Sequence, residues 1–177
     1  PPILSSVTAE AGSAEGLLPL ALSAGCGLVA LCMDEQKISP DPELRCAIAR
    51  DLVERLCGGG LPRERLYLDP MVLTIGTDTS CGLTLLRLIA LLRERFPGVR
   101  TICGASNVSF GMPERRLLNR SFVPMLAAAG MEGFLVDVKD RAMMATLRAT
   151  AALLGQDRWC REYIKAHREG LLGTPAR

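Results

Sequence analysis

Residues 103–122, CGASNVSFGMPERRLLNRSF, place an amide and two hydroxyls where a buried strand gives way to a helix. The loop carries Ser106, Asn107 and Ser109 just after Gly104. A plain turn would need only glycine and proline. The amide and the hydroxyls therefore indicate hydrogen bonds to a ligand, and an Asx-type turn that caps the following helix is the alternative interpretation.

Asp69 is the second residue whose position suggests chemistry. It ends the apolar run at residues 66–68, and Pro70 stops the strand from continuing. A carboxylate at this place can accept two parallel N–H bonds, such as those of an amino-pyrimidine edge. A plain Asp-Pro turn is an equally good interpretation of the spacing alone.

Other common catalytic and metal-binding patterns are missing from the sequence. The single histidine, His167, falls in the last predicted helix, so neither a Ser-His-Asp triad nor an H-E-x-x-H zinc site is expected. The seven cysteines include no C-x-x-C pair, which favours reduced, mostly buried thiols of a cytoplasmic protein. The glycines at 58–60 precede no Lys-Ser or Lys-Thr, so they predict a helix end and not a phosphate loop.

The composition indicates one globular domain. The chain has 177 residues, of which 49% are hydrophobic and 23% charged, with a net charge of +2 and 4% aromatic residues. This balance argues against a general nucleic-acid binder, which would show a basic face or stacking aromatics. The longest uncharged run, residues 17–33, is broken by proline, serine and glycine, so we expect neither a membrane span nor a signal peptide.

Strands and helices alternate along the chain. Apolar runs predict strands at residues 3–4, 28–33, 66–69, 101–105 and 134–138. Helical patterns fall at residues 14–24, 42–56, 83–96, 115–129, 141–154 and 157–168. The strands are apolar on both faces, which is typical of a parallel sheet covered by helices. A doubly wound sheet and a (β/α) barrel both fit, although no G-x-G-x-x-G dinucleotide motif follows any strand.

In either fold, functional groups collect at the carboxyl ends of the strands. Hydroxyls, one amide and several carboxylates lie at the predicted ends: Ser5, Ser6, Thr8, Asp34, Glu35, Asp69, Ser106, Asn107, Ser109, Asp137 and Asp140. Such a set suits a neutral, heteroatom-rich ring better than a metal ion or a phosphate.

Three stretches together resemble the pterin-binding methyltransferases. They are LYLDPMVL at 66–73, GASNVSFGMPERRLLNRSF at 104–122 and AAAGMEGFLVD at 127–137, within a similarity that extends from about residue 3 to about residue 168. The family includes the methyltetrahydrofolate:corrinoid protein methyltransferases and the folate domain of cobalamin-dependent methionine synthase. Dihydropteroate synthases are more distant relatives. The S-N-V-S loop with the downstream N-R-S-F is the most specific part.

The resemblance implies an α/β fold, the TIM (β/α)₈ barrel, over residues 1–177. The first strand of this chain would be the fourth of eight, so the expected fold is a partial barrel with strands four to eight. A complete barrel needs about 250 residues, which is more than this chain has. The first three βα units would then belong to a longer protein or to another chain.

The resemblance also implies roles for four residues. Asp69 matches the aspartate that grips the pyrimidine edge of the pterin. Asn107 matches the catalytic asparagine that reaches the methyl-bearing nitrogen. Gly104 and Ser106 match the loop that lines the ring.

Two further strand-end residues complete the expected substrate-binding set. Ser5 stands where the family has an asparagine at the end of the fourth strand, which is a departure from the family pattern. Asp34 follows the second strand of this chain. A further pterin-gripping aspartate of the family would lie on a strand outside this chain.

The implied reaction moves the methyl group of 5-methyltetrahydrofolate to the cobalt of a corrinoid. The amine is a poor leaving group, and an amide cannot readily lose a proton, so Asn107 would orient and stabilise the nitrogen. No D-x-H-x-x-G corrinoid motif is present in the sequence, so the cobalamin is expected on a partner protein. We also expect a cytoplasmic homodimer or other oligomer that binds neither nucleic acid nor membrane.

Two alternatives remain. Dihydropteroate synthases carry a Ser-Arg-Lys-type motif and an Arg-x-His near the last two strands, whereas residues 106–108 here read Ser-Asn-Val and residues 137–139 read Asp-Val-Lys. The other alternative is a non-catalytic partial barrel that only binds a pterin or serves assembly. Pterin binding would separate the assembly role from the enzymes.

Overall fold

The computed structural model describes residues 2–10, 12–33 and 38–173. Its strands are β1 (Ile3–Val7), β2 (Gly27–Leu31), β3 (Leu66–Asp69), β4 (Arg100–Cys103) and β5 (Gly133–Phe134). They form one five-stranded sheet in the order β1-β2-β3-β4-β5, and every neighbouring pair is parallel. The predicted parallel α/β arrangement is therefore confirmed.

Helices follow the strands in regular alternation. They are α1 (Ser13–Ala24), α2 (Pro42–Gly58), α3 (Cys81–Arg95), α4 (Arg115–Ala129), α5 (Arg141–Leu153) and α6 (Arg161–Arg168). Three 3-10 turns, η1 (Arg63–Arg65), η2 (Ala105–Ser109) and η3 (Arg158–Cys160), join them to their neighbours.

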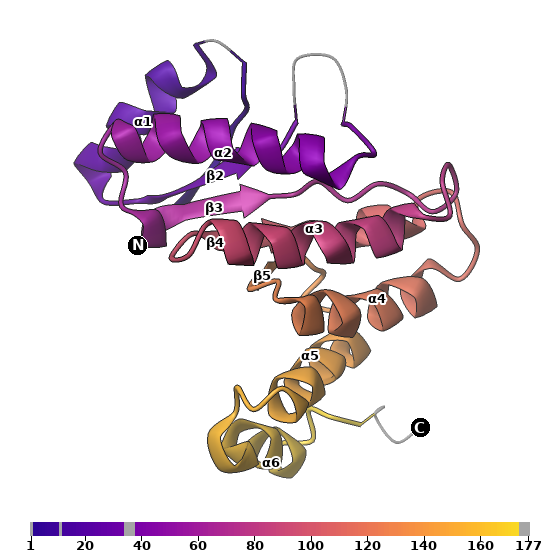
Figure 1. The fold of residues 1–177 in the computed structure, drawn as a ribbon. Coiled ribbons are helices and arrows are strands. Elements are labelled where there is room, and N and C mark those ends of the chain that lie inside the picture. The colour runs from indigo at the N-terminus through magenta and orange to yellow at the C-terminus, as the bar shows by residue number, and fades with distance from the viewer. Residues whose placement is uncertain (1, 11, 34–37, 174–177) are drawn as a thin grey trace.

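The strand order separates the two folds that the sequence left open. A doubly wound sheet places helices on both faces because its strand order reverses at a switch point. Here the order is sequential, so right-handed crossovers place each helix on the same side. Figure 1 shows α2, α3, α4 and α5 following one another, and each packs on the next. The arrangement is like a segment of a TIM barrel, and the described sheet is open at β1 and β5.

The core lies between the sheet and this helix layer. Outward-facing strand side chains are at most 1% exposed and meet fully buried side chains of α2 and α3: Leu28, Ala30, Leu66, Leu68, Leu52, Leu56, Leu88 and Ile89. Each buried leucine contributes about 1.5–3 kcal/mol relative to an exposed one. This packing fixes the strands whose ends carry the candidate site.

Local signals in the sequence set both ends of α2. The Asp41 carboxylate accepts a hydrogen bond from the Glu43 N–H at 2.9 Å, with Pro42 at the first helical position. At the other end, the Gly59 N–H caps the last turn and Gly60 adopts a φ of +101°. The triple glycine is a helix end, as predicted.

The two largest errors in the predicted extent of the elements lie in the last strand and the last helix. The last strand was expected over 134–138, but β5 ends at Phe134, and only the Leu135 N–H still reaches the Cys103 carbonyl, at 2.9 Å. Among the described residues no strand lies beyond β5, so nothing there holds the rest extended. The predicted helix 157–168 is interrupted by positive φ values at Trp159 and Cys160, and α6 begins after them.

The cysteines match the expectation from their spacing. All seven are free, and five of them are buried. Within the described ranges, no helix is both long enough and apolar enough to cross a membrane.

Candidate functional site

Two loops meet at the carboxyl ends of β3 and β4. The hydroxyl of Thr74, in the loop after β3, donates a hydrogen bond to the Phe110 carbonyl at 2.7 Å. The Ile75 N–H donates to the Val108 carbonyl at 2.9 Å. These bonds join the segment that follows Asp69 to the Ser-Asn-Val-Ser turn, so the two predicted site regions lie together.

Asp69 is half-buried at the end of β3. Its Oδ1 accepts a hydrogen bond from the Met71 N–H at 2.8 Å, which is the Asp-Pro turn of the plainer interpretation. Among the described residues, Oδ2 has no hydrogen-bond partner. Burial raises the pKa of this carboxyl, while the Met71 N–H and the charge of Arg45 act in the opposite direction. Asp69 therefore closes the turn with one carboxylate oxygen and keeps the other available to a ligand.

Asn107 lies on the exposed side of η2. Its Nδ2 is 3.9 Å from the point that a Cβ on Gly104 would occupy, so the amide lies over that glycine. Within the described part of the chain, the amide makes no hydrogen bond. The following helix, α4, begins after Glu114 without a side-chain cap bond. The amide is thus not used as a helix cap, and it is available to a ligand.

A hydrogen-bond network beneath Asn107 holds the turn in place. The buried Ser109 hydroxyl donates to Asn119 Oδ1 at 2.7 Å and accepts from Arg115 Nε at 3.1 Å. Arg115 Nη2 also donates to the Ser106 carbonyl at 3.0 Å. Ser109, expected to face a ligand, is therefore a supporting residue. Arg115 and Asn119 were not predicted from the sequence, where the only signal for them is that Asn119 begins the N-R-S-F stretch.

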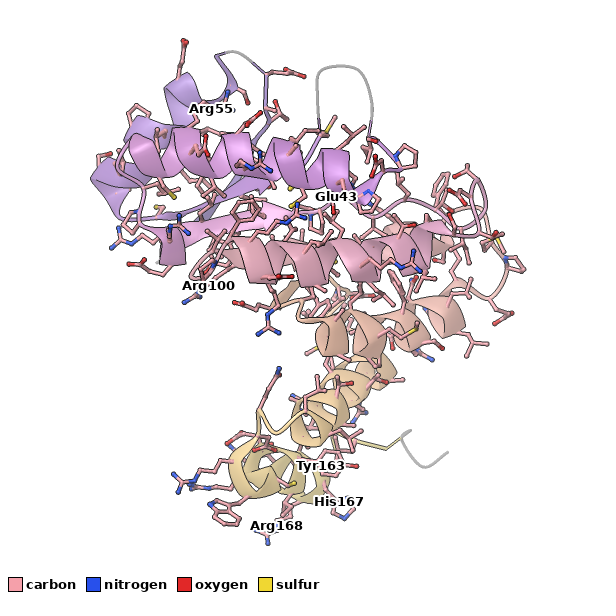
Figure 2. All side chains as sticks on the ribbon, in the orientation of Figure 1. Glu43, Arg55, Arg100, Tyr163, His167 and Arg168 are labelled. Atoms are coloured by element: carbon pink, nitrogen blue, oxygen red, sulfur yellow. The ribbon has the colours of Figure 1, made fainter. Side chains whose placement is uncertain are left out.

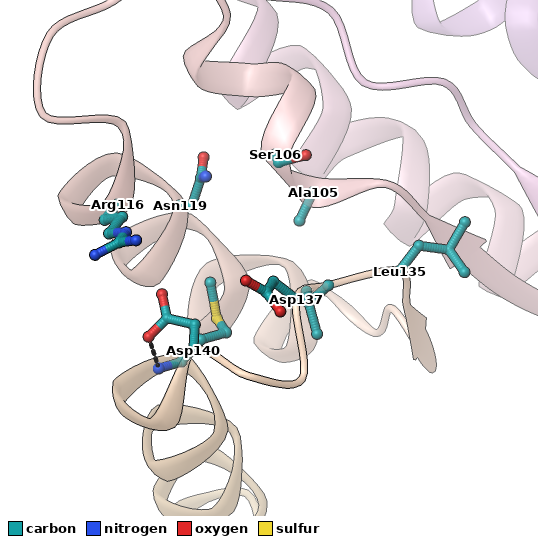
Figure 3. Close-up of a pocket in the computed structure, with 9 residues that line it drawn as sticks. Ala105, Ser106, Arg116, Asn119, Leu135, Asp137 and Asp140 are labelled. Atoms are coloured by element: carbon teal, nitrogen blue, oxygen red, sulfur yellow. Dashed lines mark hydrogen bonds between the residues drawn. The ribbon is translucent and has the colours of Figure 1, made fainter.

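A cavity of about 450 Å³ opens beside this turn. Figure 3 shows Arg116 and Asn119 of α4 on one side of the cavity and Asp137, in the loop after β5, on the other, with Ser106 of η2 near the top of this view. The volume is within the range of small-ligand sites. The lining side chains include hydrogen-bond donors and acceptors, one cation and two carboxylates. The predicted strand-end residues Ser106, Asp137 and Asp140 therefore share one cavity.

Asp140 has a local structural role at the edge of this cavity. Its carboxylate accepts a hydrogen bond from the Met143 N–H at 3.1 Å, which caps α5, and pairs with Arg120 Nη2 at 2.7 Å. The bonds from Arg120 hold the pKa of Asp140 below its ordinary range. Its carboxylate oxygens are thus already occupied by α4 and α5.

Ser5 is not at the strand end where the sequence predicted it. Ser5 was expected at the end of the first strand, but β1 continues through Val7, so Ser5 lies inside the strand and is exposed. That placement was wrong because the polar pair Ser5-Ser6 looks like a strand end in the sequence. Asp34 lies outside the described residues, and the binding roles of both stay predictions.

A comparison with known proteins finds a methyltransferase that is similar to this chain in sequence. Over 175 residues the chain is 35% identical to the methylcorrinoid:tetrahydrofolate methyltransferase of Eubacterium limosum, a match that covers 98% of this chain and 65% of that protein. The chain is therefore similar to that methyltransferase over nearly its whole length. It spans 65% of the relative's length. A scan against protein-family models found no match.

Weaker likenesses point the same way. The chain is 29% identical over 119 residues to the methionine synthases of Mycobacterium tuberculosis and Mycobacterium leprae, which covers 63% of this chain and 10% of each of those proteins. The solved structure of Mycobacterium tuberculosis Rv1207 superposes with a TM-score of 0.58 at 24% identity, over 80% of this chain and 55% of that one. The structural likeness shows a shared fold.

Proposed function

We propose that this chain forms the folate-binding part of an enzyme that moves a methyl group between 5-methyltetrahydrofolate and the cobalt of a corrinoid protein. The observation that carries the proposal is the 35% identity, over 98% of the chain, to the Eubacterium limosum methyltransferase. The free Asn107 amide and the free Asp69 oxygen at the ends of adjacent strands support it.

In the proposed mechanism, Asp69 accepts hydrogen bonds from the amino edge of the pterin ring. Asn107 orients the methyl-bearing N5 and stabilises the charge that changes there, and Gly104 leaves room for the ring beside it. The carbon–nitrogen bond breaks as the reduced cobalt supplies the electron pair of the new bond, and N5 receives a proton from solvent. Asn107 is suited to orientation because its amide donates without ionising.

The proposal covers methyl transfer in both directions between the folate and the corrinoid. The name of the Eubacterium limosum relative puts the methylcorrinoid first, as the donor. The direction implied by the sequence resemblance is the reverse, from folate to corrinoid. Both directions pass through one transition state, so the same residues serve either one.

The corrinoid would come from a partner protein. The sequence contains no D-x-H-x-x-G motif, and its one histidine, His167, lies exposed on α6, far along the chain from the candidate site (Figure 2). We therefore treat the corrinoid as the second substrate and the corrinoid protein as the partner.

Residues 1–177 would supply strands four to eight of a (β/α)₈ barrel. The sequential parallel strands and the helices that pack each on the next support this assignment. The remaining strands would come from the rest of a longer protein or from another chain.

The test mixes the protein that carries this chain with methyl-labelled 5-methyltetrahydrofolate and a reduced corrinoid protein, and follows the cobalt absorbance and the label. We expect the label to move to the corrinoid, and to return when the methylcorrinoid is mixed with tetrahydrofolate. Condensation of a pterin pyrophosphate with p-aminobenzoate would instead support the dihydropteroate synthase alternative. Folate binding without either reaction would favour the non-catalytic partial barrel.

A further inference from the structure

Arg45 of α2 is almost completely buried, which is rare for an arginine. It is 1% exposed, and it is the one charged residue among the buried side chains of the described chain. Arginine is almost never fully buried unless it is paired. Among the described residues no carboxylate lies within ion-pair distance of Arg45, and its buried Nε has no hydrogen-bond partner there. This placement calls for an explanation beyond core packing, because an apolar side chain of similar volume would avoid the desolvation of the charge.

The guanidinium reaches the turn that carries Asp69. Arg45 Nη2 donates a hydrogen bond to the Met71 carbonyl. The backbone N–H of Met71 donates a hydrogen bond to Asp69 Oδ1 at 2.8 Å. Met71 has a φ of +61°, which is uncommon for a residue with a side chain and needs support from its surroundings. Arg45 and Asp69 thus hold Met71 through its carbonyl and its N–H.

The charge of Arg45 also affects the ionisation of Asp69. Its positive charge lowers the pKa of the Asp69 carboxyl, against the effect of burial. The other titratable groups that face Asp69 from the described elements are Cys32, after β2, and Cys103, at the end of β4. Burial raises the pKa of Cys103 to about 12 and that of Cys32 further, so both thiols are neutral at physiological pH.

We infer that Arg45 is a positioning residue for substrate binding, which fixes the 69–71 turn so that Asp69 Oδ2 is held toward the ligand as an ionised acceptor. The inference rests on the proposed function, because it assumes that Asp69 binds the amino edge of a pterin. Arg45 acts through Met71 and through its charge. It contacts no substrate itself in this account.

The first test needs no ligand. The pKa of Asp69 is measured by carbon-13 NMR of its carboxyl group in the protein that carries this chain, and in Arg45→Met, Arg45→Lys and Arg50→Met. Arg50 is exposed on the same helix, so Arg50→Met is the matched control. We expect a higher Asp69 pKa in Arg45→Met, and values near the wild type in Arg45→Lys and Arg50→Met. An unchanged Asp69 pKa in Arg45→Met overturns the inference.

The second test measures binding of 5-methyltetrahydrofolate against pH. Arg45→Met should raise the Kd about tenfold or more at pH 7. Its loss of binding on acidification should begin at a higher pH, because an ionised Asp69 is needed and its pKa has risen. Arg45→Lys should restore the position of this acid limb, which a purely structural role would not do. Equal affinity and an equal acid limb in Arg45→Met contradict the inference.

The two readouts separate the possible failures. If the wild-type protein binds no folate but the Asp69 pKa rises in Arg45→Met, the proposed function is wrong and the action of Arg45 on Asp69 stands. If Arg45→Met does not unfold cooperatively, Arg45→Gln takes its place in both tests, because its amide keeps a donor for Met71 without the charge. A normal Asp69 pKa together with normal binding in Arg45→Gln then overturns the charge effect.

Discussion

The surroundings of Asp69, the residue proposed to bind the pterin, set the properties of its carboxylate. One of its carboxylate oxygens closes the turn at Met71, and burial disfavours the charge on the group. In the folded protein, an aspartate with a raised pKa is harder to ionise than in the unfolded chain. Above its unfolded pKa this costs stability, and the cost grows as pH rises toward the folded pKa.

Asp69→Asn should therefore separate stability from binding. An asparagine oxygen can still accept the Met71 N–H, and no charge is buried, so the free energy of unfolding at pH 7 should stay equal or increase. Folate binding should weaken by about 1.5–3 kcal/mol, because a charge-assisted pair is lost. Urea denaturation and folate titration measure the two quantities.

The exposed Asp51 of α2 offers the control Asp51→Asn, which should change neither quantity. Unchanged folate affinity in Asp69→Asn would return Asp69 to the role of a plain turn residue.

At the scale of elements, η2 depends on α4. Ser109→Ala would remove the hydroxyl that joins Arg115 to Asn119 beneath the Asn107 turn. The variant loses two hydrogen bonds, each worth about 0.5–1.5 kcal/mol, so we expect a loss of about 1–3 kcal/mol in the free energy of unfolding. The exposed Ser121 of α4 provides the control Ser121→Ala. Equal stability of the two variants would mean that the network does not hold the turn.

The junction of α4 and α5 should be sensitive to acid. Arg120 holds the pKa of Asp140 below its ordinary value of 3.8, so the pair stabilises the fold fully above that pH. This contribution is lost as pH falls through the lowered pKa of the folded state. Asp140→Asn should cost about 1 kcal/mol at neutral pH and nothing once the wild-type carboxyl is protonated. Urea denaturation from pH 7 to pH 2 measures the difference, and a constant difference across that range would exclude the ion pair as its cause.

The sequence predicts the elements better than the roles of their residues. The helix predicted at 115–129 has the observed bounds of α4, since its apolar spacing and Gly130 mark it clearly. The strand at 134–138 was too long, because an apolar run does not show whether a neighbouring strand exists to pair with it. Arg45 was not identified, because in the sequence it is one charge on an amphipathic helix, and only the packing of the β3 turn buries it. Asp69 and Asn107 were proposed as site residues from the motifs around them, and their roles stay predictions.

The whole molecule presents open sheet edges. β1 and β5 lie at the two sides of the described sheet, and apolar residues at or just beyond them are exposed, with Ile3 44%, Leu135 58% and Val138 72% accessible. Unpaired strand edges and exposed apolar surface favour association. Residues 1–177 alone should therefore self-associate or bind a hydrophobic dye. A monodisperse, cooperatively unfolding monomer in sedimentation would count against the partial barrel.

Single-turnover methyl transfer by Asn107→Ala, measured beside equilibrium folate binding, tests the central claim most directly. An interaction made mainly in the transition state affects the rate more than ground-state binding. We expect the transfer rate between 5-methyltetrahydrofolate and a reduced corrinoid protein to fall by roughly 10²-fold or more, the scale for loss of one preorganised donor. Folate affinity should change far less. Equal losses of rate and affinity, or full activity without the amide, would contradict the account of this site.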